Sequence, residues 1–122
     1  MKWIVFVTLS SFGAGLRWLF NHYGEKYFEA IPIPMGTLLA NSLGAFLIGW
    51  IYASYSQSKL NISGPLFLLL IIAFLGSLTT FSSFALDSIK LFQNGLWNWA
   101  LLNIFLNNFF ALSLCYLGIK LN

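Results

Sequence analysis

Charged residues are scarce in this sequence. Only 7% of the 122 residues are Asp, Glu, Lys or Arg, whereas about 25% is usual in a soluble domain. The mean hydropathy is +0.82, and 59% of the residues are hydrophobic. A protein with so few charges cannot cover its surface against water. The sequence therefore predicts an integral membrane protein, with one domain that spans residues 1–122.

The side chains that most often catalyse reactions or bind metals are also few. The acids are Glu25, Glu29 and Asp87. His22 is the single histidine, and Cys115 is the single cysteine, which excludes an intramolecular disulfide. These residues have neither the spacing of a metal site nor that of a nucleophile beside its base. The basic residues form no cluster that would bind nucleic acid. We therefore expect neither an enzyme nor a nucleic-acid-binding protein.

Four apolar segments are long enough to cross about 30 Å of hydrocarbon as helices. They lie at about residues 3–20, 35–55, 66–92 and 96–118. Pro32 and Pro34 keep the first connection non-helical just before the second segment. Pro65 fits the first turn of the third helix, and Asn94-Gly95 provides a tight turn before the fourth. The predicted fold is an all-α, multi-pass membrane protein with four transmembrane helices.

The third segment is longer than one crossing needs, and its middle is unsuited to a helix. Residues 66–92 would form a helix about 40 Å long. Gly76 begins a stretch with five hydroxyl side chains, which belong to Ser77, Thr79, Thr80, Ser82 and Ser83. Glycine and hydroxyl residues weaken a helix, and irregular backbone inside a membrane must face protein or a wet cavity. We therefore predict that the third helix is broken here, at the functional centre.

Polar residues in the other segments indicate either helix–helix hydrogen bonds or a polar track. Asn41 lies in the second segment, and Asn103 and Asn107 share one face of the fourth, four residues apart. Phe81 and Phe84 share a face of the third segment, among its hydroxyls. The edge of an aromatic ring is positive. Amides, hydroxyls and ring edges without acids suit an anion better than a cation.

Positive charges are divided equally between the two ends of a four-helix topology. The two sets are Lys2, Lys59 and Lys120 on one side, and Arg17, Lys26 and Lys90 on the other. The bias of Lys and Arg that normally fixes orientation is therefore absent. Either another feature fixes one orientation, or the chain inserts both ways and assembles as an antiparallel dimer. Asp87 is expected to form a local ion pair with Lys90, three residues away.

Three motifs resemble those of the Fluc (CrcB-type) fluoride channels. Gly13-x-Gly15-x-Arg17 resembles the glycine-rich first helix of that family, with its closing arginine. Gly36-Thr37-Leu38-x-x-Asn41-x-x-Gly44 is similar to the second-helix motif. Gly76-x-x-Thr79-Thr80-Phe81-Ser82-Ser83-Phe84 is similar to the third-helix signature. The resemblance covers all four predicted spans in order.

The resemblance implies a passive, fluoride-selective channel of the bacterial inner membrane that exports fluoride and protects the cell from its toxicity. It implies a dual-topology antiparallel homodimer in the lipid, with two pores built from both subunits. The implied fluoride pathway contains Asn41, Phe81, Ser82, Ser83, Phe84 and Asn107. Arg17 is implied in the vestibule. A central structural Na⁺ is implied at the backbone carbonyls of Gly76 and Thr79.

The fourth segment departs from the family pattern. Hydroxyl residues usually recur there at four-residue spacing, but this chain has Asn107, Ala111 and Cys115. The change alters the outer half of the polar track, or it marks one subunit of a heterodimer with a second homologous chain. Two other functions are less well supported. A small multidrug or cation exchanger needs an acid in the first span, and a non-transporting subunit needs no polar central motif.

Overall fold

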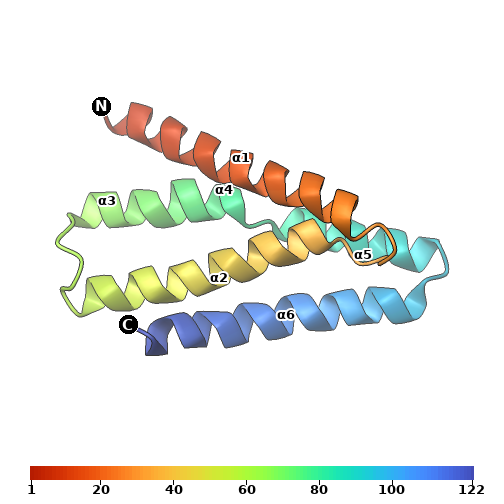
Figure 1. Ribbon diagram of the computed structural model, residues 1–122. Coiled ribbons are helices and arrows are strands. Elements are labelled where there is room, and N and C mark those ends of the chain that lie inside the picture. The colour runs from red at the N-terminus through yellow and green to blue at the C-terminus, as the bar shows by residue number, and fades with distance from the viewer.

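The computed structural model describes all of residues 1–122, and its regular elements are all helical. Four long helical segments run back and forth along one bundle (Figure 1). They span Lys2–Tyr27, Met35–Ser56, Gly64–Gln93 and Trp97–Lys120, and each is long and apolar enough to cross a membrane. This confirms the predicted all-α fold of a multi-pass membrane protein.

The ends of the helices follow from local sequence. Helix α1 (Lys2–Tyr27) continues past residue 20, where the predicted span ended. Helix α2 (Met35–Ser56) begins directly after Pro34. Pro65 lies in the first turn of α3 (Gly64–Leu69), as predicted. Gly95, whose φ is +75°, turns the chain from α5 (Phe81–Gln93) into α6 (Trp97–Lys120).

The third span is broken, as the sequence predicted. After α3 it widens into the π-helix η1 (Leu70–Leu75), where the Gly76 N–H bonds to the Ile71 carbonyl. The short helix α4 (Gly76–Leu78) follows. Thr79 (φ −85°, ψ 153°) and Thr80 (φ −149°, ψ 117°) are extended, and α5 then begins. Figure 1 shows this extended connection between α4 and α5.

Helix α2 lies between α1 and α6 and contacts both. Its contact with α6 is close because two glycines lack a side chain there. A Cβ atom on Gly49 would collide with the Cys115 carbonyl, and one on Gly118 would collide with the Phe46 carbonyl. Small residues of this kind let membrane helices approach backbone to backbone. The α2–α6 pair therefore makes the most extensive helix–helix contact of the bundle, and α5 packs against α6.

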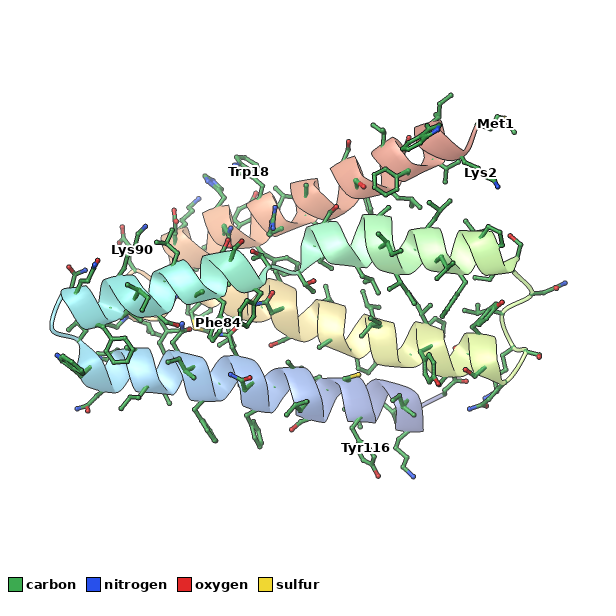
Figure 2. The ribbon with its side chains drawn as sticks, turned by 180° about the vertical axis from the view of Figure 1, so that it is seen from behind. Met1, Lys2, Trp18, Phe84, Lys90 and Tyr116 are labelled. Carbon is green, nitrogen blue, oxygen red and sulfur yellow. The ribbon has the colours of Figure 1, made fainter.

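The two ends of the bundle carry different connections. Both chain termini and the α2–α3 connection lie at one end, and the α1–α2 and α5–α6 connections lie at the other (Figure 1). Lys2 and Lys90 accordingly stand at opposite ends (Figure 2). Large apolar side chains between these ends are exposed, including Leu112 at 74% and Phe105 at 59%. Such an outer surface suits contact with hydrocarbon.

Candidate functional site

Asn41 of α2 binds the backbone that the break in the third span exposes. The Thr80 N–H donates to Asn41 Oδ1 at 2.8 Å, and Asn41 Nδ2 donates to the Thr80 carbonyl at 3.2 Å. In a continuous α-helix the Thr80 N–H would instead bond to the Gly76 carbonyl. Buried backbone groups need partners, and Thr80 is buried. The side chain of Asn41 therefore supplies the hydrogen bonds that Thr80 would make in a continuous helix, and it stabilises the break.

Thr80 also forms the cap at the start of α5. Its Oγ1 accepts a hydrogen bond from the Ser83 N–H at 3.1 Å and donates to Ser83 Oγ at 3.1 Å. The Ser82 hydroxyl lies 3.3 Å from the same oxygen. A helix N-terminus carries a partial positive charge. The break therefore places a positive helix end and three hydroxyl groups within the membrane-spanning part of the chain.

Three asparagine side chains continue from the break along α6. Asn41 Nδ2 donates to Asn107 Oδ1 at 3.1 Å, and Asn107 Nδ2 donates to Asn103 Oδ1 at 3.0 Å. Asn103 Nδ2 then donates to Ser88 Oγ of α5 at 3.0 Å. Asn103, Asn107 and Ser88 are all buried. The sequence left two alternatives for these side chains, interhelical hydrogen bonding and a polar track. The hydrogen bonds join α2, α5 and α6, and the same side chains form one polar series.

A groove of about 460 Å³ opens beside the break. Six of the residues predicted from the sequence line it: Asn41, Gly76, Thr79, Phe81, Phe84 and Asn107. Thr80, Asn108 and Ala111 are among its other lining residues, and no acid lines it. The groove thus combines amides, hydroxyls and aromatic rings in one place.

The two aromatic rings of the groove differ in exposure. The centroids of Phe81 and Phe84 are 5.4 Å apart, with their planes at 51°. Phe84 is half-buried and lies between α5 and α6 near the middle of the bundle (Figure 2). Phe81 is 80% exposed at the open side. One chain therefore covers Phe84 but leaves Phe81 without a protein neighbour on that side.

A second cavity, of about 450 Å³, lies beside the α1–α2 connection. Ser83 and Asp87 of α5 line it together with Glu25, Glu29 and Thr37. Asp87 accepts a hydrogen bond from the Thr37 hydroxyl at 3.3 Å, and no contact of ion-pair length joins it to the predicted Lys90. Because Ser83 lines this cavity and bonds to Thr80 of the groove, the two cavities adjoin at this hydroxyl pair.

Three of the predicted site residues do not line the groove, and one of them, Ser83, lines the second cavity instead. Arg17 is half-buried on α1 and lines neither the groove nor the second cavity. Ser82 is exposed and reaches the site only through its contact with the Thr80 hydroxyl. The predicted site in turn omitted Thr80 and Ser88. A hydroxyl residue just before an apolar helix is a signal for a cap, and it would have identified Thr80.

Comparison with known proteins gives consistent matches along the whole chain. The family model described as "CrcB-like protein, Camphor Resistance (CrcB)" matches residues 4–119. A protein of Shewanella frigidimarina named "Fluoride-specific ion channel FluC" is 43% identical over 111 residues, which cover 91% of this chain and 87% of that protein. Proteins of the same name from a Nitratiruptor species and from Shewanella woodyi are 41% and 40% identical, over 90% and 99% of this chain and 83% and 96% of their own lengths.

Proposed function

From the premise that the chain belongs to the CrcB-like protein family, we propose that it is a passive, fluoride-selective channel of the bacterial inner membrane. The relatives that match most of its length are named as fluoride-specific ion channels. The observation that carries the proposal is the groove at the break. It combines a helix N-terminus, two phenylalanine rings and amide groups, and no acid lines it.

These groups suit a small anion for stated physical reasons. The positive edges of Phe81 and Phe84 can face an anion without trapping it in a strong ion pair. The N-terminus of α5 adds a partial positive charge. Ser83 in the adjoining cavity and Ser82 at the exposed start of α5 offer hydroxyls that can replace water around the ion as it enters or leaves the groove. Both hydrogens of the Asn41 amide are already donated, to Thr80 and to Asn107. An anion that binds Asn41 therefore has to displace one of these two acceptors.

Export needs only the membrane potential. Fluoride that enters a cell as neutral hydrogen fluoride ionises inside, and the anion cannot return through hydrocarbon. A potential that is negative inside drives each fluoride outward with about 2.3 kcal/mol per 100 mV. The absence of acids from the groove fits a passive pathway, because coupling to protons would need a titratable group there. Fluoride leaves down its electrochemical gradient, and the cell is protected from its toxicity.

We propose that the working unit is an antiparallel homodimer, with two pores and lipid around its outer surface. The open groove and the exposed Phe81 ring support this, since a second copy would cover them. The equal division of positive charges between the two ends supports insertion in both orientations. Three lysines added to the 57–61 connection should impose one orientation and sharply reduce transport. Unchanged transport would contradict the antiparallel unit.

We also propose that a central Na⁺ binds the backbone carbonyls of Gly76 and Thr79. Unwound backbone in membrane helices commonly supplies carbonyl oxygens to Na⁺. The Gly76 carbonyl fits this role, because the Thr80 N–H that a continuous helix would give it bonds to Asn41 instead. Gly76 is also exposed at the groove. The ion would offset the partial negative charges of the carbonyl oxygens at the break. Replacing Na⁺ by a large organic cation during purification should lower transport.

The deciding experiment is fluoride efflux from liposomes that contain only this purified chain. Valinomycin and potassium set the voltage, and chloride-loaded liposomes serve as the control. We expect fast efflux of fluoride and none of chloride. No efflux from well-folded protein would reject a homomeric channel. If efflux then appeared on adding a second homologous chain, the heterodimer implied by the altered fourth helix would replace it.

A further inference from the structure

We propose that Ser88 and Asn103 are positioning residues, which set the orientation of the Asn107 and Asn41 amides at the groove. Neither residue lines the groove. Both are buried, at 4% and 1% exposure, and they act through a chain of side-chain hydrogen bonds that ends at the break. The inference rests on the proposed function only for its effect on fluoride. Its effect on the backbone at Thr80 stands independently.

The chain of hydrogen bonds runs in one direction from end to end. It starts at the Thr80 N–H, which donates to Asn41. Each asparagine then donates its amide hydrogen to the next residue, from Asn41 to Asn107, from Asn107 to Asn103, and from Asn103 to Ser88. The Ser88 hydroxyl finally donates to the Phe84 carbonyl at 2.8 Å. This series of hydrogen bonds therefore begins at the backbone of Thr80, just before α5, and ends at the backbone of Phe84, in the first turn of α5.

Backbone groups fix this direction. A backbone N–H can only donate, so the Asn41 atom that faces the Thr80 N–H must be the oxygen. The Asn41 nitrogen then faces Asn107, whose nearer atom must be an oxygen. The Asn107 nitrogen also donates to the Asn103 backbone carbonyl at 3.0 Å, which can only accept. No amide in the series can turn over without setting two donors or two acceptors against each other.

Ser88 decides the far end of the series. Its hydroxyl gives one hydrogen to the Phe84 carbonyl, which leaves its oxygen free to accept from Asn103. If that acceptor is removed, the buried Asn103 amide loses the partner that holds its nitrogen toward α5. Asn103 can then rotate, and the Asn107 nitrogen keeps only one of its two acceptors, the Asn103 backbone carbonyl. A less firmly held Asn107 weakens the acceptor to which Asn41 donates, and with it the hold of Asn41 on Thr80.

The test compares three variants with two controls. Ser88→Ala removes the terminal acceptor, Ser88→Thr keeps a hydroxyl that can bond in the same way, and Asn103→Leu removes two links at similar volume. Thr8→Val controls for Ser88→Ala, since the Thr8 hydroxyl also donates to a carbonyl one turn back, but outside the series. Asn98→Leu controls for Asn103→Leu at an exposed position of the same helix.

The first readout is backbone hydrogen exchange in peptides that cover residues 76–84. Since one hydrogen bond changes an equilibrium by up to about tenfold, Ser88→Ala should speed exchange at Thr80 by about tenfold. Asn103→Leu should speed it by about a hundredfold, because two links are lost. Ser88→Thr and both controls should match the unmodified chain. Faster exchange along the whole of α5 and α6 would mean general destabilisation, and it would overturn the proposal.

The second readout is fluoride efflux from liposomes. We expect Ser88→Ala to lower efflux by about tenfold, Ser88→Thr to restore it, and both controls to leave it unchanged. Exchange at Thr80 that is unchanged in Ser88→Ala and Asn103→Leu would overturn the proposal whatever the efflux. Unmodified protein that passes no fluoride would instead reject the proposed channel function, and the exchange data would still judge the hydrogen-bond series.

Discussion

The two halves of the third span are held in place by different forces. The first half, from Gly64 to Leu78, packs against α1. Gly13 of α1 lies so close to it that a Cβ atom would meet the Phe74 carbonyl and the Leu78 nitrogen. The second half, α5 with its cap Thr80, is joined to α2 and α6 by hydrogen bonds that Thr37, Asn41 and Asn103 donate. The break at Thr79 and Thr80 separates a packed segment from a hydrogen-bonded one.

This difference indicates where function and where stability depend on sequence. Apolar packing is non-directional, so it fixes the volume of a segment more than the orientation of any group. Hydrogen bonds are directional and determine which atoms face a cavity. The aromatic rings of the proposed fluoride pathway, Phe81 and Phe84, accordingly belong to the hydrogen-bonded half. Substitutions in the first half should change the free energy of unfolding, and those in the second half should change transport as well.

The largest effect is expected from Asn41→Leu. This change leaves the Thr80 N–H and carbonyl without partners, and each unpaired buried group costs about 1–3 kcal/mol. We expect a loss of about 3 kcal/mol or more in the free energy of unfolding and no measurable fluoride efflux. Asn108→Leu is the comparison for stability, since the Asn108 amide bonds only to Ile104 of its own helix. Thermal unfolding in detergent measures the stability of the two variants, and equal stabilities would contradict the role of Asn41.

The next comparison substitutes one phenylalanine in each half of the third span. Phe81→Ile should lower fluoride efflux by about a hundredfold or more, the scale of losing one preorganised partner of an ion. Its stability should change little, because Phe81 is 80% exposed. Phe74→Ile should do the reverse, since the Phe74 ring stacks on Phe12 with centroids 5.7 Å apart in the packed half. Efflux and unfolding of both variants test this, and full efflux from Phe81→Ile would reject the ring-edge pathway.

Two glycines of α1 test the packing of the first half. Gly13→Ala brings a methyl group against the backbone of α4 and η1 and should cost about 1–3 kcal/mol, as overpacked cores do. Gly15→Ala faces open space, with no atom within 4 Å of the added Cβ. It should stabilise the protein by about 0.5–1 kcal/mol, the helix preference of alanine over glycine. Equal unfolding temperatures for the two variants would show that α1 does not rest on the broken span.

The features that the sequence predicted well are those with a local cause. Glycine and clustered hydroxyls in an apolar run predicted the break, and i, i+4 spacing predicted the shared face of Asn103 and Asn107. The π-helix η1 was not predicted, because the apolar residues of 70–75 carry no signal that separates it from an α-helix. The end of α1 at Tyr27 was missed because hydropathy marks the hydrocarbon span, whereas the helix continues beyond it.

Pairings between helices could not be derived from the sequence. Ser88 and Asn103 bond because the rotation of α5 and α6 about their own axes turns these two side chains toward each other. No residue pattern in the sequence fixes that rotation. For the same reason Asp87 was assigned to Lys90 on its own helix, whereas it bonds to Thr37 of α2. Spacing along a helix identifies neighbours within that helix only. Contacts across helices depend on packing of the whole bundle.

The smallest effect distinguishes two adjacent threonines at the break. The Thr80 hydroxyl caps α5 by accepting from the Ser83 N–H, so Thr80→Val should cost about 1 kcal/mol, as the loss of a helix cap does. The Thr79 hydroxyl bonds only to the Leu75 carbonyl, which already accepts from the Thr79 N–H. Thr79→Val should therefore stay within about 0.5 kcal/mol of the unmodified protein. Both changes preserve shape and extended backbone, so chemical unfolding isolates the hydroxyl. If Thr79→Val cost more stability than Thr80→Val, the hydrogen-bonded half would begin before Thr80, and the boundary between the two halves would lie in α4.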